Sequence, residues 1–309
     1  MPDVPEIVRP PAVGGRTGRP RTAAVLPVRG TPALLDGCLE ALQRQDLPLD
    51  ELVVVDDNRP GAPPTEVRRE GVHLVRSGGL GPYAARNLGW RSTSADVVLF
   101  VDVRSRPRPS WSLTVVGAFA DPAVAVAGTE TATLTGPTLT ERASAASDTY
   151  ALRHYTHRPF FRPYLPGCNL AVRRSDLEAV GGFEEGRSGG DADLCWRVLA
   201  RPGRRLETSD EVLMDWVPRR RARDYVEQHF RYGGSNFALR SSWADHGAPA
   251  RPVAPRRRLA HDAALTALRV PWAVVRRRED RLEQLLRDTG ALAHQLGYRR
   301  AWVAAGRPR

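Results

Sequence analysis

Cysteine is scarce in this 309-residue chain. Its three cysteines, Cys38, Cys168 and Cys195, are too few and too scattered for a disulfide framework, and no two have zinc-site spacing. A reducing, cytoplasmic location is therefore expected. Long apolar runs are also missing, since none reaches the roughly 18 residues that a membrane-spanning helix needs. Residues 1–20 lack the apolar segment of a signal peptide, and their proline, glycine and arginine content predicts a disordered lead-in.

Several signatures of other function classes are absent. No Gly-x-Ser-x-Gly elbow supports a Ser-His-Asp triad, and no Gly-x-Gly-x-x-Gly follows the first expected strand as it does in dehydrogenases. The net charge of +11 comes almost entirely from arginine. This favours anionic partners, although heavy arginine use is equally typical of a GC-rich genome. The arginines are spread along the chain without a helix-turn-helix, zinc or RNP signature, so a nucleic-acid partner is not expected.

Short β-type runs alternate with helical stretches from Thr22 onward. Apolar, β-branched runs occupy 23–28, 51–57 and 95–102, and leucines recur at helical spacing after the first of them. Such strands, separated by helices, predict an α/β fold with a mostly parallel central sheet covered by helices on both faces. Ligands of such sheets bind at the carboxyl ends of the strands.

Further elements are predicted downstream. We expect a helix near 111–120, a strand at 123–130, a short strand at 211–217 and a helix at 221–240. From about residue 241 the chain is arginine-rich and helical, with breaks expected at three prolines, Pro252, Pro255 and Pro271.

Carboxylates follow two of the predicted strands. The stretch VLFVDVRSRP places Asp102 directly after a buried strand and follows it with two arginines, Arg104 and Arg106. Asp56 and Asp57 end the preceding strand, where they form an Asx turn or accept hydrogen bonds from a nucleobase or ribose. Both interpretations remain open from the residues alone.

Three other stretches have a functional interpretation beside a structural one. Asp191 stands at a helix start, as an N-cap or as a general base. The glycines of 77–89 precede a helix that can cradle a phosphate, although the Walker ending is missing. On the helix at 221–240, Arg231 belongs to a solvated face or pairs with a phosphate.

Taken in order, these motifs resemble the family 2 glycosyltransferases, which are inverting enzymes of the GT-A fold. The resemblance covers roughly residues 22–240 and rests on seven stretches: VLPVRG, LVVVDD, GPYAARNLG, LFVDVRSRP, PGCNLAVRRSDLEAVGGF, GGDADLCWR and QHFRYG. It implies a Rossmann-like GT-A domain at 21–240, followed by a helical extension at 241–309. It also implies a nucleotide-sugar donor, with UDP or dTDP favoured over GDP, and inversion at the anomeric carbon.

The resemblance assigns roles to individual residues. Asp191 is the implied general base. The implied donor-nucleotide residues are Pro27, Val28, Arg29, Asp56, Asp57, Arg86, Asn87, Asp102, Val103 and Arg104. The implied acceptor region contains Gly167, Cys168, Asn169 and Asp193. The closing helix contributes, at the diphosphate, Gln228, Arg231 and Tyr232.

The chain departs from the family pattern at the metal motif. The family usually has Asp-x-Asp where this chain has Asp102-Val103-Arg104, and Glu-Asp where it has Gly190-Asp191. Asp215 stands where the family often has a histidine. Asp102 and Asp215 are therefore candidate ligands for Mg²⁺ or Mn²⁺, but Arg104 can itself neutralise phosphate oxygens. We favour reduced or absent metal dependence. The remaining alternatives for the function are a catalytically inactive GT-A-like binding protein and a basic nucleic-acid-binding protein.

The acceptor and the tail stay open. A sugar, a lipid-linked compound, a natural product or a peptide would each fit as acceptor. Leucines at near-helical spacing within 282–296 predict helices packed on the catalytic domain or, alternatively, a basic amphipathic face on an anionic membrane. A peripheral position at the inner face of the membrane is thus the alternative to a purely cytoplasmic one.

Overall fold

A computed structural model of the chain describes residues 18–306 except 31, 68, 185, 187 and 277. Most of the predicted lead-in, residues 1–17, lies outside the described residues. The chain divides into two compact units. The first, here called the sheet unit, contains the chain up to Thr131, with Tyr155–His157 and Pro163–Trp216. The second, the helical unit, contains Ala132–His154, Arg158–Arg162 and the chain from Val217 onward.

The sheet unit is built on eight strands. They are β1 Thr22–Val28, β2 Glu51–Asp56, β3 Val72–Arg76, β4 Val97–Val101, β5 Ser105–Pro107, β6 Val124–Thr133, β7 Asn169–Arg173 and β8 Arg205–Trp216. Its helices are α1 Pro32–Gln43, α2 Pro82–Arg91, α3 Trp111–Ala118, α5 Arg174–Val180 and α6 Gly190–Leu199.

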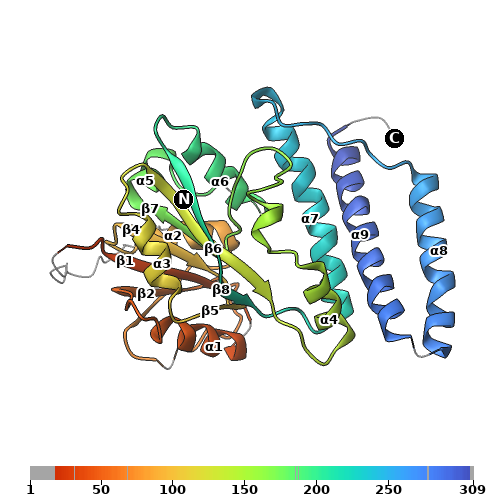
Figure 1. Ribbon diagram of the computed structural model, residues 1–309, viewed down its shortest axis with the longest axis horizontal. Coiled ribbons are helices and arrows are strands. Elements are labelled where there is room, and N and C mark those ends of the chain that lie inside the picture. Colours follow the sequence, from red (N-terminus) through yellow and green to blue (C-terminus); the bar gives the residue numbers. More distant parts are fainter. Residues whose placement is uncertain are drawn as a thin grey trace. The chain divides into compact units, whose positions relative to one another are not determined.

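The strands form one sheet in the order β3-β2-β1-β4-β7-β6-β8-β5 (Figure 1). The pairs β2–β3, β1–β2 and β1–β4 are parallel, whereas β4–β7, β6–β7 and β5–β8 are antiparallel. The parallel half matches the apolar runs of the sequence, because strands buried on both faces are nearly continuous in hydrophobic residues. The predicted α/β fold is confirmed, and the carboxyl ends of β1, β2 and β4 lie at one edge.

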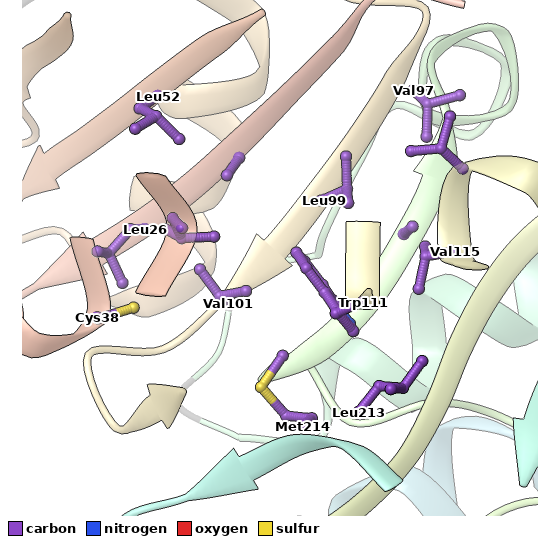
Figure 2. Packing of buried hydrophobic residues seen from close by; sticks show 14 of the residues in the cluster. Leu26, Cys38, Leu52, Val97, Leu99, Val101, Trp111, Val115, Leu213 and Met214 are labelled. Carbon is purple, nitrogen blue, oxygen red and sulfur yellow. The ribbon is translucent and has the colours of Figure 1, made fainter. Parts of the chain in front are cut away.

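Helices cover both faces of the parallel half. On one face, Leu26 of β1 and Leu99 of β4 share a buried cluster with Trp111 of α3 and with α1 (Figure 2). Fully burying a side chain of the size of Leu26 contributes about 1.5–3 kcal/mol. On the other face, α2 approaches closely because Gly89 lies directly against Val25. This packing positions α2 and the strand ends, on which the candidate site is built.

Four α-helices of the helical unit lie among the described residues. They are α4 Leu139–Ser147, α7 Ala222–Ser242, α8 Arg256–Val275 and α9 Glu279–Ala304, with 3₁₀ turns at Leu152–His154 and Ala244–His246. Figure 1 shows α9 running between α7 and α8. In the part of the chain that the structure describes, no helix combines the length and the apolar character that crossing a bilayer requires.

One predicted break in this unit is wrong. Pro252 and Pro255 do precede α8, but Pro271 lies inside it. Proline removes one backbone donor and crowds the preceding turn. Because α8 ends only four residues later, at Val275, few helical hydrogen bonds depend on the turn that Pro271 disturbs.

Glycines allow α7 and α9 to approach each other closely. A Cβ atom added to Gly233 would overlap the backbone oxygen of His294, and one added to Gly297 would overlap the backbone oxygen of Phe230. Neither helix backbone can yield easily at these points, because its own hydrogen bonds fix it. The two glycines therefore set the distance between the helices.

The stability of the helical unit should depend on pH through His294. Burial, together with the nearby positive groups Arg251, His229 and Arg240, lowers the pKa of His294 to about 4. In the unfolded chain the pKa returns to about 6.5. Between pH 6.5 and about 4, the histidine is protonated in the unfolded chain but not in the folded one, so the free energy of unfolding decreases as the pH falls. The total decrease is about 2 kcal/mol after solvent screening is taken into account.

The expected result is a smaller loss of unfolding temperature between neutral and mildly acidic pH in His294→Gln than in the unsubstituted protein. Thermal unfolding by circular dichroism across this pH range measures it. Identical pH profiles for the two proteins would show that another group is responsible.

Candidate functional site

Asp191 lies in the first turn of α6, with its carboxylate held by three donors. Oδ1 accepts from the Tyr83 hydroxyl at 3.3 Å and from the Ala192 backbone N–H at 3.1 Å, and Oδ2 accepts from the Gly167 backbone N–H at 2.9 Å. The N-cap position itself belongs to Gly189. The N-cap interpretation of Asp191 is therefore wrong, because the residue lies inside the helix.

Asp102 follows β4 and forms an ion pair with Arg86 of α2. The Arg86 Nη2 atom lies 2.6 Å from Asp102 Oδ1 and also donates to the Gly167 carbonyl at 3.3 Å. The Asp102 side chain is 39% exposed and that of Arg86 only 6%, so the carboxylate faces outward from a buried cation. A continuous series of contacts thus leads from Asp102 through Arg86 and Gly167 to Asp191.

Aromatic rings enclose Arg86. Its guanidinium lies 5.5 Å from the ring centroid of Tyr83 and 5.9 Å from that of Phe183, and the two rings stack on each other. The buried Nε atom of Arg86 has no hydrogen-bond partner among the described residues. A desolvated cation of this kind interacts more strongly with an anion than a hydrated one does.

Tyr83 is a site residue that the sequence reasoning missed. Burial raises the pKa of the Tyr83 hydroxyl well above its ordinary value, and the Asp191 charge raises it further. The hydroxyl therefore stays protonated and keeps donating. A Cβ atom on Gly190 would lie 2.8 Å from the Tyr83 ring, so glycine at 190 makes room for the ring. The sequence feature that could have pointed to Tyr83 is the glycine of Gly190-Asp191, which stands where the family usually has glutamate.

Replacing Tyr83 by phenylalanine should lower the rate of the activity proposed below. Tyr83→Phe removes a hydrogen-bond donor to the Asp191 carboxylate and with it part of the fixed orientation of that group. We expect kcat, measured in a steady-state assay of product formation, to fall by about tenfold. An unchanged kcat would show that Tyr83 only packs beside the site.

Asp56 and Asp57 are both buried and bound by their own chain. The Asp56 carboxylate accepts hydrogen bonds from the backbone of Asn58, as in an Asx turn, and from Thr65. Burial opposes ionisation of Asp56, but these hydrogen bonds outweigh it and lower its pKa. Asp57 accepts from Ser77 and from the N–H of Gly81, the N-cap of α2. The turn interpretation is thus realised, and Asp57 fixes the glycine loop that was considered as a phosphate cradle.

The other residues predicted to bind the donor nucleotide differ in how far their side chains are exposed. Arg29 is exposed after β1, where Val28 is buried and Pro27 is partly buried. Arg104 is partly buried, with its guanidinium 5.8 Å from the centroid of the Trp216 ring, and Val103 beside it is also partly buried.

Asn87 attaches α2 to the segment around Phe183. Its amide donates to the Phe183 carbonyl and accepts from the Phe183 N–H and the Trp90 indole. Its role in binding the donor nucleotide stays a prediction.

Two residues of the predicted acceptor region belong to the core, and the role of the region stays a prediction. The side chains of Cys168 and Asn169 are buried in the core. The Asn169 amide accepts from the Trp111 indole and donates to Thr129, contacts that join β7 to α3 and β6. Of this group, Gly167 reaches Asp191 through its backbone, while Asp193 pairs with Arg197 one turn along α6.

The three closing-helix residues belong to the helical unit. Gln228 is buried and donates to the hydroxyls of Tyr150 and Tyr232, while its oxygen accepts from Arg219. The Arg231 guanidinium lies 5.5 Å from the Tyr232 ring centroid, and its buried Nε has no hydrogen-bond partner among the described residues. A fully solvated face is thus wrong for this part of α7; the diphosphate role remains a prediction.

The two candidate metal ligands are each paired with an arginine. Asp215 accepts two hydrogen bonds from Arg108, at 2.8 and 3.1 Å, and Asp102 accepts one from Arg86. Nowhere in the described ranges do three or more His, Cys, Asp or Glu side chains gather as a metal site would require. A divalent cation can also be held by one or two carboxylates together with substrate phosphates, so the role of Asp102 and Asp215 as metal ligands stays a prediction.

Comparison with known proteins agrees with this architecture. A sequence model described as Glycosyl transferase family 2 matches residues 23–181. Over 174 residues, 55% of this chain, it is 33% identical to the pre-mycofactocin glycosyltransferase of two Mycobacterium tuberculosis strains, and it spans 37% of the length of those relatives. The fold is similar to that of a mannosyltransferase from Pyrobaculum calidifontis solved with GDP-Man and Mn²⁺. The TM-score is 0.58 at 20% identity, over 89% of this chain and 87% of that one.

The family match covers just over half of the chain and includes β1 to α5, with the strand ends that carry Asp56, Asp57 and Asp102. The chain therefore belongs to glycosyl transferase family 2.

Proposed function

We propose that this protein is an inverting glycosyltransferase that moves a sugar from a nucleoside diphosphate sugar to an acceptor hydroxyl. The observation that carries the proposal is the series of contacts from Asp102 through Arg86 and Gly167 to Asp191. In this proposal the Asp191 carboxylate accepts a proton, and the buried Arg86 guanidinium beside Asp102 attracts the diphosphate.

Asp191 is the proposed general base. It takes the proton of the acceptor hydroxyl while the acceptor oxygen attacks the anomeric carbon. The bond from that carbon to the diphosphate breaks on the opposite side, and the electron pair leaves with the diphosphate. Tyr83 and Gly167 hold the Asp191 carboxylate in one orientation, which reduces the entropy cost of reaching the reactive geometry.

Arginines neutralise the departing diphosphate in this proposal. Arg104 stands where the family has its second aspartate, and Arg86 is buried next to Asp102. At an effective dielectric constant near 20, a close charge pair contributes about 4 kcal/mol of gross Coulomb energy. We propose reduced or absent metal dependence on these grounds. A cation-assisted reaction is the alternative that the experiment below distinguishes.

UDP or dTDP is the proposed nucleotide, with GDP as the alternative. Because the mycobacterial relatives are named for pre-mycofactocin, that compound is the first acceptor to test. Sugar, lipid-linked, other natural-product and peptide acceptors follow. The proposed general base requires a hydroxyl in each of them.

The test is thermal unfolding with UDP, dTDP, GDP or CDP, each with Mn²⁺ or with EDTA. We expect one nucleotide to raise the unfolding temperature equally in both conditions, because arginines rather than a metal hold the diphosphate. Stabilisation that appears only with Mn²⁺ would contradict the metal-independent part. No stabilisation by any nucleotide would favour a catalytically inactive protein of this family.

A further inference from the structure

A pocket of about 650 Å³ opens in the helical unit, between the segment before α8 and the C-terminal part of α9. Three arginines and Trp302 dominate its lining. The lining residues are Arg251, Val253, Pro255, Arg256, Arg299 and Trp302. None of them belongs to the candidate catalytic site, and the family match ends well before them.

The lining carries positive charge without compensation. Residues 246–261 and 289–306 contain six arginines and no aspartate or glutamate. Arg258, outside the lining, pairs with Asp262 of α8. Within the described part of the chain, none of the three lining arginines forms an ion pair with a carboxylate. Three adjacent positive charges raise the local potential and favour an anion in the pocket.

Neutral groups orient two of these arginines. Arg299 donates to the Ala254 carbonyl at 3.1 Å, and its guanidinium lies 6.0 Å from the ring centroid of Trp302. The Arg251 guanidinium lies 5.5 Å from the centroid of the Tyr298 ring. Each guanidinium has five N–H donors, so most of them remain available for a ligand.

The start of α8 adds to this arrangement. Arg256 is the first residue of the 20-residue helix, and its exposed side chain lines the pocket. The first N–H groups of a helix lack intrahelical partners and carry partial positive charge. The partial positive charge of this helix start therefore adds to the charge of the pocket lining.

We propose that this pocket binds a phosphate group, carried by an anionic lipid or by a free phosphate compound. Guanidinium groups match phosphate because their paired N–H donors fit two oxygens at once. The flat indole of Trp302 supplies an apolar wall beside the cations, which suits the ester-linked part of such a ligand. The proposal does not depend on glycosyl transfer.

The test uses the full chain with four probes. Inorganic phosphate and pyrophosphate are titrated while the unfolding temperature is followed, and vesicles of phosphatidylcholine, with or without phosphatidylglycerol, are used in flotation. The variants are Arg256→Gln alone and the triple variant Arg251→Gln/Arg256→Gln/Arg299→Gln. The control removes the same charge from three exposed arginines of this unit outside the pocket, Arg223, Arg276 and Arg281.

We expect Arg256→Gln to weaken binding about tenfold, the pocket triple variant to abolish it and the control to retain it. Binding of the soluble anions would identify a free phosphate compound as the ligand, whereas binding of phosphatidylglycerol vesicles alone would identify a lipid headgroup. Absence of binding by the unsubstituted protein, or equal losses in both triple variants, would overturn the proposal. Arg256 is exposed, so its single variant keeps the test valid if the triple variant unfolds.

Discussion

Asp191→Asn should lower kcat by about 10³-fold and leave the fold intact. Asparagine keeps the size of the side chain, and its single amide oxygen can accept from Gly167 while its NH₂ group faces the Tyr83 hydroxyl, but it cannot take a proton at neutral pH. General-base catalysis contributes roughly 10²–10⁴-fold. The measurement is the rate of product formation with the donor identified by thermal unfolding, at saturating donor and acceptor.

The control is Asp210→Asn on β8. The Asp210 side chain is 82% exposed and lies 3.9 Å from His157, so its replacement removes a carboxylate that the proposed site does not use. Nucleotide-induced stabilisation should persist in both variants. If Asp191→Asn retains most of its activity, another group removes the proton and the assignment of the base is wrong.

Gly233→Ala and Gly297→Ala should each destabilise the helical unit by about 3 kcal/mol or more. At both positions the added methyl group would overlap a backbone oxygen of the facing helix, at His294 and Phe230 respectively. The helices must then separate, and overpacking of this kind costs about 1–3 kcal/mol even where side chains can adjust. Backbone atoms adjust less. The higher helix propensity of alanine offsets only about 1 kcal/mol.

Gly234→Ala is the control for this pair of variants. It lies next to Gly233 on α7, but its added Cβ atom would be 3.7 Å from the Gly297 oxygen, an ordinary contact. Its unfolding temperature should stay equal or rise slightly, because alanine favours the helix. Thermal unfolding of the three variants is followed by circular dichroism. Equal losses of unfolding temperature in all three would contradict our interpretation.

The parallel strands could be predicted because strands buried on both faces consist largely of consecutive apolar residues. β1, β2 and β4 are apolar without interruption, whereas β8 was predicted only at 211–217 and begins at Arg205. The first half of β8 is partly or fully exposed and polar, so it carries no hydrophobic pattern to detect. The antiparallel half of the sheet had no local signal for its pairing, because register between distant strands depends on tertiary contacts.

The positions of the motifs predicted where the site lies in the chain better than they predicted which side chains are available to a ligand. Asp102, Arg86 and Asp191 do connect, but Asn87 and Asn169 turn their amides to partners that are distant in the chain, Phe183 and Trp111. A buried amide needs all its hydrogen bonds satisfied, and sequence alone does not reveal which partners satisfy them. Tyr83 was missed for the converse reason, since tyrosine on an amphipathic helix is usually read as packing.

The residue that joins the proposed base to the buried cation does so entirely through its main chain. Gly167 gives its N–H to Asp191 and its carbonyl to Arg86, and a Cβ atom there would lie 3.3 Å from the arginine. A mutational scan should therefore rank substitutions at this position by side-chain volume and hardly by polarity. In related proteins with another small residue at this position, the two backbone hydrogen bonds could still form. A sequence alignment, which compares side chains, would not reveal them.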